Sequence, residues 1–103
     1  MYLVNTEYVA GRDIEMLGLV RGSTIQSKNF AHDIGAGLKT LVGGEIKSYT
    51  DMMNNARDIA TDRMVTEAER LGADAIVGVR YTTSGVMQGA AEILVYGTAV
   101  KFK

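Results

Sequence analysis

The sequence predicts an α+β protein in which one long helix packs against a three-stranded antiparallel sheet. An amphipathic pattern with helical spacing runs through Tyr49–Leu71. Two strand-like stretches, Asp74–Thr82 and Ala90–Phe102, follow this pattern, and a third, Ile14–Ile25, precedes it. The 103 residues are the usual length of one domain, so we expect residues 1–103 to form a single domain.

Two candidate strands lie at the start of the chain. Tyr2–Asn5 would be a short extra strand, and Ile14–Ile25 a longer one that contains Gly18 and Gly22. Glycine inside a strand often marks a bulge or the close approach of another backbone. Simple alternation along the longer strand puts Leu17, Leu19 and Ile25 on one face and Ile14, Met16 and Val20 on the other.

A short first helix is expected between the longer strand and the long helix. Gly43–Gly44 would end it. Gly35 and Gly37 each weaken it by about 1 kcal/mol relative to Ala, so it would depend on packing. The apolar residues that recur at helical spacing are Phe30, Ile34, Leu38, Leu41 and Val42.

The long helix, Tyr49–Leu71, has the strongest local signals. Ser48 followed by Asp51 resembles a capping box at its start. Gly72 stands where a residue with left-handed backbone conformation commonly ends a helix. The apolar stripe consists of Tyr49, Met52, Met53, Ala56, Ile59, Ala60, Met64, Ala68 and Leu71.

The last two strands are expected to form an antiparallel hairpin around TSGVMQG, residues 83–89. A loop centred on Val86 would place Arg80 opposite Glu92, and such a pair contributes roughly 0.2–1 kcal/mol across a sheet. Both strands carry apolar residues on both faces, and one helix covers only one face of a three-stranded sheet. The first helix is one candidate cover for part of the second face. The more economical expectation is that copies of the chain cover it, because an uncovered apolar patch promotes aggregation.

Composition excludes several classes of protein. The formal net charge is −1 and Lys and Arg are scattered, so we expect no nucleic-acid partner. The chain has no Cys, which excludes thiolate metal sites, Cys nucleophiles and disulfides. No apolar run approaches the ~20 residues that span a bilayer, and the N-terminus does not resemble a signal peptide. We expect a cytoplasmic protein with no membrane partner.

Four stretches resemble the YbjQ-like family, which is described as a heavy-metal-binding domain family. They are VGGEIKSY (Val42–Tyr49), ARDIA (Ala56–Ala60), LGADAIVGVRY (Leu71–Tyr81) and YGTAV (Tyr96–Val100). The resemblance implies a dodecin-like β-α-β-β subunit with an extra short N-terminal strand. It also implies assembly into a homopentameric ring, with a decamer as a larger stack, and no established enzymatic activity.

His32 and Asp33 are the candidate ligands for a divalent metal ion. Consecutive helical residues point about 100° apart, so the two side chains of one chain rarely chelate together. A symmetric ring would instead bring copies of His32 or Asp33 together near its axis. The metal and any other cofactor stay unidentified at this stage.

We interpret the chain as a homo-oligomeric scaffold or a module that binds a small molecule or an ion. The alternative is an enzyme whose active site forms between subunits and uses Asp33, Glu45, Arg80 or His32. A third interpretation, a metal-sequestering protein, follows from the family resemblance. The residues expected to matter for assembly are Tyr2, Val4, Gly43, Gly44, Glu45, Tyr49, Arg80 and Glu92.

Overall fold

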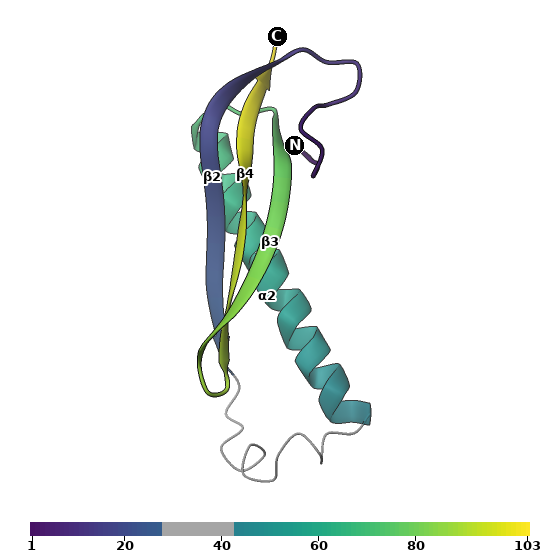
Figure 1. Cartoon of the computed structure of the whole chain (residues 1–103), viewed down its shortest axis with the longest axis vertical. Coiled ribbons are helices and arrows are strands. Elements are labelled where there is room, and N and C mark those ends of the chain that lie inside the picture. Colours follow the sequence, from purple (N-terminus) through teal and green to yellow (C-terminus); the bar gives the residue numbers. More distant parts are fainter. Residues whose placement is uncertain (28–42) are drawn as a thin grey trace.

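The structure is a computed structural model that describes residues 1–27 and 43–103, and the side chains of residues 1–27 and 47–103. These residues form an α+β fold with a single helix and a four-stranded mixed sheet (Figure 1). The first helix predicted before Gly43 lies outside the described residues. The elements are β1 (Tyr2–Leu3), β2 (Ile14–Ser27), α2 (Gly43–Arg70), β3 (Ala75–Met87) and β4 (Ala90–Phe102).

The sheet has the strand order β1-β3-β4-β2. β2 and β3 both pair antiparallel with β4, as the sequence predicts for the three long strands. β1 pairs in parallel with the start of β3, where Tyr2 lies opposite Ala75, and this short strand makes the sheet mixed. α2 crosses one face of the sheet, which leaves the opposite face without a helix among the described residues (Figure 1). We call this opposite face the second face.

Three register shifts interrupt the sheet, and the one between Gly85 and Met87 lies next to the hairpin turn. The other two change which residues of the long strands share a face. The pairing of β2 with β4 shifts between Met16 and Gly18, and the pairing of β3 with β4 shifts between Val77 and Arg80. The second shift contains Gly78, whose φ of 63° is a backbone conformation that glycine adopts readily. An extra residue reverses the alternation, so the predicted faces of β2 are wrong beyond Gly18. Leu17 and Val20 pack in the core under α2, whereas Met16, Leu19 and Ile25 are exposed.

The core under α2 depends on small residues. Ala56, Ala60, Met64 and Ala68 recur every fourth residue, and all four are fully buried. Gly22 on β2 lies directly beneath this row. A Cβ atom at Gly22 would overlap the Ala60 carbonyl oxygen and lie 2.5 Å from the Met64 nitrogen. The expected close approach of a backbone is thus confirmed at Gly22, and a bulge is confirmed at Gly18.

The helix begins earlier than predicted and ends where predicted. α2 starts at Gly43, so Gly43 and Gly44 lie in its first turn and Ser48 lies inside it rather than capping it. At the other end, Ala73 N donates to Ala68 O at 3.1 Å and Gly72 N donates to Glu69 O at 3.0 Å. With the φ of 79° at Gly72, these bonds form a Schellman motif that ends the helix.

The hairpin turn is shorter than predicted, and the proposed Arg80–Glu92 pair is wrong. β3 runs on to Met87, so only Gln88 and Gly89 connect it to β4. Gly89 has a φ of 78°, which a two-residue turn of this kind accommodates most easily with glycine. In the resulting register Arg80 lies opposite Tyr96, and Glu92 lies opposite Ser84.

Candidate functional site: the second face of the sheet

The N-terminal segment covers one end of the second face. Ala75, Val77 and Val100 are buried there beneath Val4, Val9, Ile14 and Phe102. Backbone hydrogen bonds hold the segment beyond β1: Val79 N donates to Val4 O at 3.0 Å, and Gly78 N donates to Thr6 O at 2.8 Å. Part of the second face is therefore covered within one chain by the N-terminal segment, a role that was not predicted for these residues.

Aromatic and charged contacts fix the same end of the sheet. The Arg12 guanidinium carbon lies 4.6 Å from the centre of the Phe102 ring, a cation–π distance. The rings of Tyr2 and Phe102 are 6.0 Å apart. Asp74 Oδ2 accepts a hydrogen bond of 2.8 Å from Phe102 N. These contacts give the N-terminal segment a defined position over the ends of β3 and β4.

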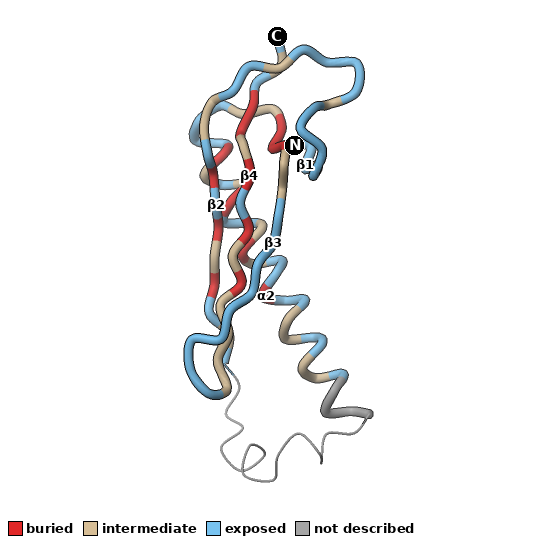
Figure 2. Tube along the Cα trace, in the orientation of Figure 1, coloured by how far each residue is buried: buried red, intermediate tan, exposed pale blue. Residues whose placement is uncertain are grey.

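Beyond the N-terminal segment, the second face stays uncovered by any described residue. Met16 is 78% exposed, Leu19 68% and Ile25 60%. Figure 2 shows that β3 is likewise exposed from its middle to the hairpin, whereas buried residues gather where α2 crosses β2 and β4. Several large apolar side chains of one face are thus in contact with water when the chain is alone, an arrangement typical of interaction surfaces.

A groove of about 500 Å³ lies between the N-terminal segment and this uncovered face. Its walls are mixed. Met16, Leu19 and Val77 supply apolar surface, while Glu7, Arg80 and Tyr96 supply polar groups. Small-molecule sites commonly combine an apolar lining with a few polar groups that orient the ligand. The groove is therefore the candidate binding site on the described part of the chain.

A row of three polar side chains crosses the sheet at one end of the groove. Arg21 on β2 and Arg80 on β3 both lie opposite Tyr96 on β4, so all three project from the second face. Both arginines are exposed, and Tyr96 is 36% exposed. Neither Arg21 nor Arg80 forms a hydrogen bond or ion pair with another described residue. We call Arg21, Tyr96 and Arg80 the arginine row.

The residues predicted for assembly are dispersed in the structure. Tyr2 is exposed and Val4 packs on the buried end of the second face. Tyr49 lies on α2, away from this face, together with the backbone of Gly43, Gly44 and Glu45. Of the predicted residues whose side chains the structure describes, only Arg80 lines the groove. The structure does not bring the predicted set together in one chain.

The described residues do not form a metal site on their own. No group of three or more His, Asp or Glu side chains among residues 1–27 and 47–103 is close enough to hold a metal ion. His32 and Asp33 lie outside the described residues, so their role as ligands stays a prediction. Within the described part of the chain, no helix has the length and apolar character needed to cross a membrane.

Comparisons with known proteins place the chain in a family. The model of a family described as "Putative heavy-metal-binding" matches residues 1–103, as the sequence motifs predicted. The chain is a member of this YbjQ-like family. A YbjQ-like relative from Clostridium novyi (strain NT), named UPF0145 protein, is 64% identical over 98% of each chain. Another UPF0145 protein, from Alkaliphilus metalliredigens (strain QYMF), is 63% identical over 99% of each chain.

A solved structure supports the same fold. The crystal structure of a protein of unknown function from Pediococcus pentosaceus ATCC 25745, assigned to the DUF74 family, superposes on the chain with a TM-score of 0.71. It covers 100% of this chain and 98% of its own, at 18% sequence identity. Such a similarity establishes the shared fold of this YbjQ-like chain and the crystallised protein.

Sequence reasoning did not identify Glu7, Arg21 or Tyr96 as parts of one site. Glu7 belongs to a segment without regular alternation, and only the fold places it over β3. Arg21 follows the bulge at Gly18, so its face could not be assigned from alternation alone. An available signal was that β2 and β3 each contain a single basic residue, an arginine in both strands.

Proposed function

We propose that this YbjQ-like chain assembles with copies of itself into a homopentameric ring in the cytoplasm, and that the ring is a module that binds a small ligand. The observation that carries the proposal is the uncovered part of the second face, where Met16 and Leu19 are exposed beside a groove. The number of subunits and the dodecin-like assembly rest on the family resemblance.

The edges of the sheet supply a way for copies to join. Among the described residues, β2 pairs only with β4, and β3 is paired on its outer side only near β1. Long unpaired edges readily pair with other chains. Both strands run antiparallel to β4 and hence parallel to each other, so β2 of one copy would pair in parallel with β3 of the next.

This contact is head-to-tail, because it joins two different edges. Head-to-tail contacts close into a ring when the rotation between copies is right. Helices are about 10 Å wide, so α2 fits on the outside of such a ring more easily than on the inside. The second faces would then turn toward the interior and bring their apolar side chains together.

Pairs of introduced cysteines provide the test, because the natural chain has no Cys. Ser23, Leu94 and Thr82 share one row, so Ser23 and Thr82 are separated by two strand spacings, about 10 Å. A disulfide needs Cα atoms less than about 7 Å apart, so a bond between cysteines introduced at these two positions would form only between chains. Ser23→Cys combined with Thr82→Cys or with Ser84→Cys samples two registers of the contact.

At least one of the two double variants is expected to give, after mild oxidation, a ladder of linked chains that stops at the pentamer on denaturing gels. The single variants are the controls, and they should give dimers at most. Ladders absent from both double variants would contradict the pairing of β2 with β3. A ladder that continues past the pentamer would contradict the closed ring.

The family description extends the proposal to a metal ion. His32 and Asp33, repeated around the ring, are the candidate ligands, and they would hold a divalent cation such as zinc. Zinc is expected to remain bound to the wild-type ring through gel filtration and to be lost from His32→Ala, as measured by elemental analysis. Equal zinc content in the two proteins would exclude His32 as a ligand.

A further inference from the structure

We propose that the arginine row binds the oxyanion head of a small amphipathic ligand, a carboxylate or a phosphate monoester, whose apolar part lies in the adjoining groove. The inference deepens the proposed function and rests on it, because the ring would turn the arginine row toward its interior. It assigns a ligand class to the second face that differs from a metal cation.

The geometry of the arginine row suits an oxyanion. Arg21 and Arg80 stand on either side of Tyr96, with Cα atoms about two strand spacings, or 10 Å, apart. Two long side chains at that separation can converge above the tyrosine between them. A guanidinium donates two parallel hydrogen bonds to a carboxylate or phosphate, and the tyrosine hydroxyl adds another donor.

The charges around the arginine row leave it with an excess of positive charge. Glu92, the nearest acidic residue on the strands of the second face, lies about 13 Å along β4 from Tyr96. The uncharged row of Ser23, Leu94 and Thr82 separates it from the arginines. Among the acidic residues that the structure describes, only Glu7 of the N-terminal segment lines the groove with Arg80, and no ion pair joins the two. Two guanidiniums thus face one carboxylate.

The groove explains why the ligand should carry an apolar part. From Tyr96 it continues past Thr98 toward Val100, between Leu19 and Met16 on β2 and Val77 on β3. An apolar chain in this position would lie against Leu19 and Met16, and its own removal from water is worth roughly 25 cal/mol per Å² of buried surface. The head on the arginine row and the body in the groove then lie in one line along β4.

Assembly strengthens the case for an anion. A ring would repeat the arginine row in every subunit on its inner side, and the like charges would repel one another. Bound anions relieve this repulsion, because each anion attracts the guanidinium groups around it. The attraction is stronger inside the ring than in water, because the local dielectric constant is lower there. Ligand binding and ring stability would therefore be coupled.

The experiment is isothermal titration of the purified full chain with octanoate and, separately, with octyl phosphate. Binding is expected for both or for one of them, which tells whether a carboxylate or a phosphate head is preferred. Neutral 1-octanol and acetate should bind at least about tenfold more weakly, because each lacks one half of the ligand. Octanol binding as tight as octanoate would overturn the proposal.

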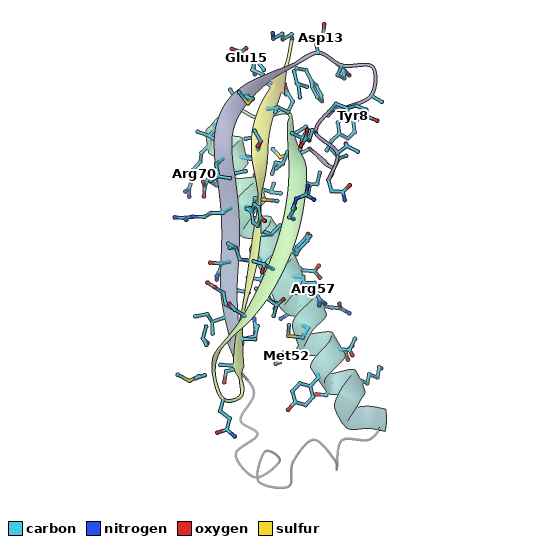
Figure 3. All side chains as sticks on the ribbon, in the orientation of Figure 1. Tyr8, Asp13, Glu15, Met52, Arg57 and Arg70 are labelled. Carbon is cyan, nitrogen blue, oxygen red and sulfur yellow. The ribbon has the colours of Figure 1, made fainter. Side chains whose placement is uncertain are left out.

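Three substitutions test the residues. Arg21→Gln and Arg80→Gln should each raise the Kd for octanoate about tenfold or more, as expected for a lost charged hydrogen bond. Glu7→Gln should lower the Kd severalfold, because it removes the only carboxylate that lines the groove among the described residues. The matched control is Arg70→Gln, which removes the same charge from α2, away from the second face (Figure 3).

The proposal is overturned if the Kd of Arg21→Gln and Arg80→Gln equals that of the wild type, or if Arg70→Gln weakens binding equally. Both arginines are exposed and unpaired among the described residues, so their variants should fold, and thermal unfolding checks this. The mass of the assembly is measured on the same samples. A ring that binds neither octanoate nor octyl phosphate contradicts the anion site alone, and a monomer that binds either of them contradicts the ring alone.

Discussion

Replacing Gly22 by Val is expected to lower the free energy of unfolding by about 3 kcal/mol or more. Gly22 lies under the backbone of α2, and a Cβ there would overlap the Ala60 carbonyl oxygen. Backbone atoms cannot move aside as a flexible side chain can, so the whole helix would shift from the sheet. Added atoms in a well-packed core usually cost about 1–3 kcal/mol, and this contact is more severe.

Gly85→Ala is the matched control for this substitution. Gly85 is a strand glycine on β3, exposed, with no atom within 4 Å of the position its Cβ would occupy. The free energy of unfolding of the Gly85→Ala protein should stay within about 0.5 kcal/mol of the wild-type value. Urea unfolding at one protein concentration compares the two variants. A Gly22→Val protein as stable as Gly85→Ala would show that α2 does not press on β2 as described.

Replacing Met16 by Glu is expected to separate the subunits while leaving each subunit folded. Met16 is 78% exposed in the single chain, so a charged side chain there costs little in an isolated subunit. In the ring it would be turned to the interior, where copies of the new carboxylate would repel one another and the burial of Met16 would be lost. Burying a Met side chain is worth about 1.5–3 kcal/mol, so the ring should dissociate at about tenfold higher concentration or more.

Sedimentation velocity over a dilution series measures this effect. Leu71→Glu is the control, because Leu71 is also exposed, at 47%, but lies just after α2 and away from the second face. The control should sediment as the wild type does. If Met16→Glu also sediments as the wild type, the uncovered part of the second face is not where the copies meet.

The long helix and its packing could be predicted well from the sequence. The stripe containing Ala56, Ala60 and Met64 requires only helical periodicity, and Gly72 is a local signal for a helix end. The predicted start of the helix at Tyr49 was wrong. Glycine is disfavoured in a helix interior, but Gly43 and Gly44 lie in the first turn, where it is tolerated. Local signals thus predicted the buried face of α2 better than they predicted its length.

The sheet was harder to predict. Every error in its prediction concerns pairing between residues that are far apart in the sequence. The stretch TSGVMQG contains Gly85 and Gly89, and either could supply a turn. Only the register with β4 selects Gly89 and extends β3 to Met87. The bulge at Gly18 could be suspected from the glycine, but the reversal of faces that follows it depends on the pairing partners in β4.

The candidate site was the least predictable part. Arg21, Tyr96 and Arg80 come from three strands, and they form one row only in the register that the bulges create. Glu7 reaches the groove because the N-terminal segment bonds to Gly78 and Val79. The uncovered second face, in contrast, was expected from the apolar residues on both sides of β4, and Met16, Leu19 and Ile25 are exposed there.

Native mass spectrometry of the purified wild-type protein tests the central claim most directly. The homopentameric ring predicts a dominant species at five times the 11.1 kDa mass of the chain, or at ten times if two rings stack. Any mass beyond the protein would come from a retained ligand or metal. A dominant monomer at concentrations of tens of micromolar would contradict the ring and show that the second face stays exposed to water.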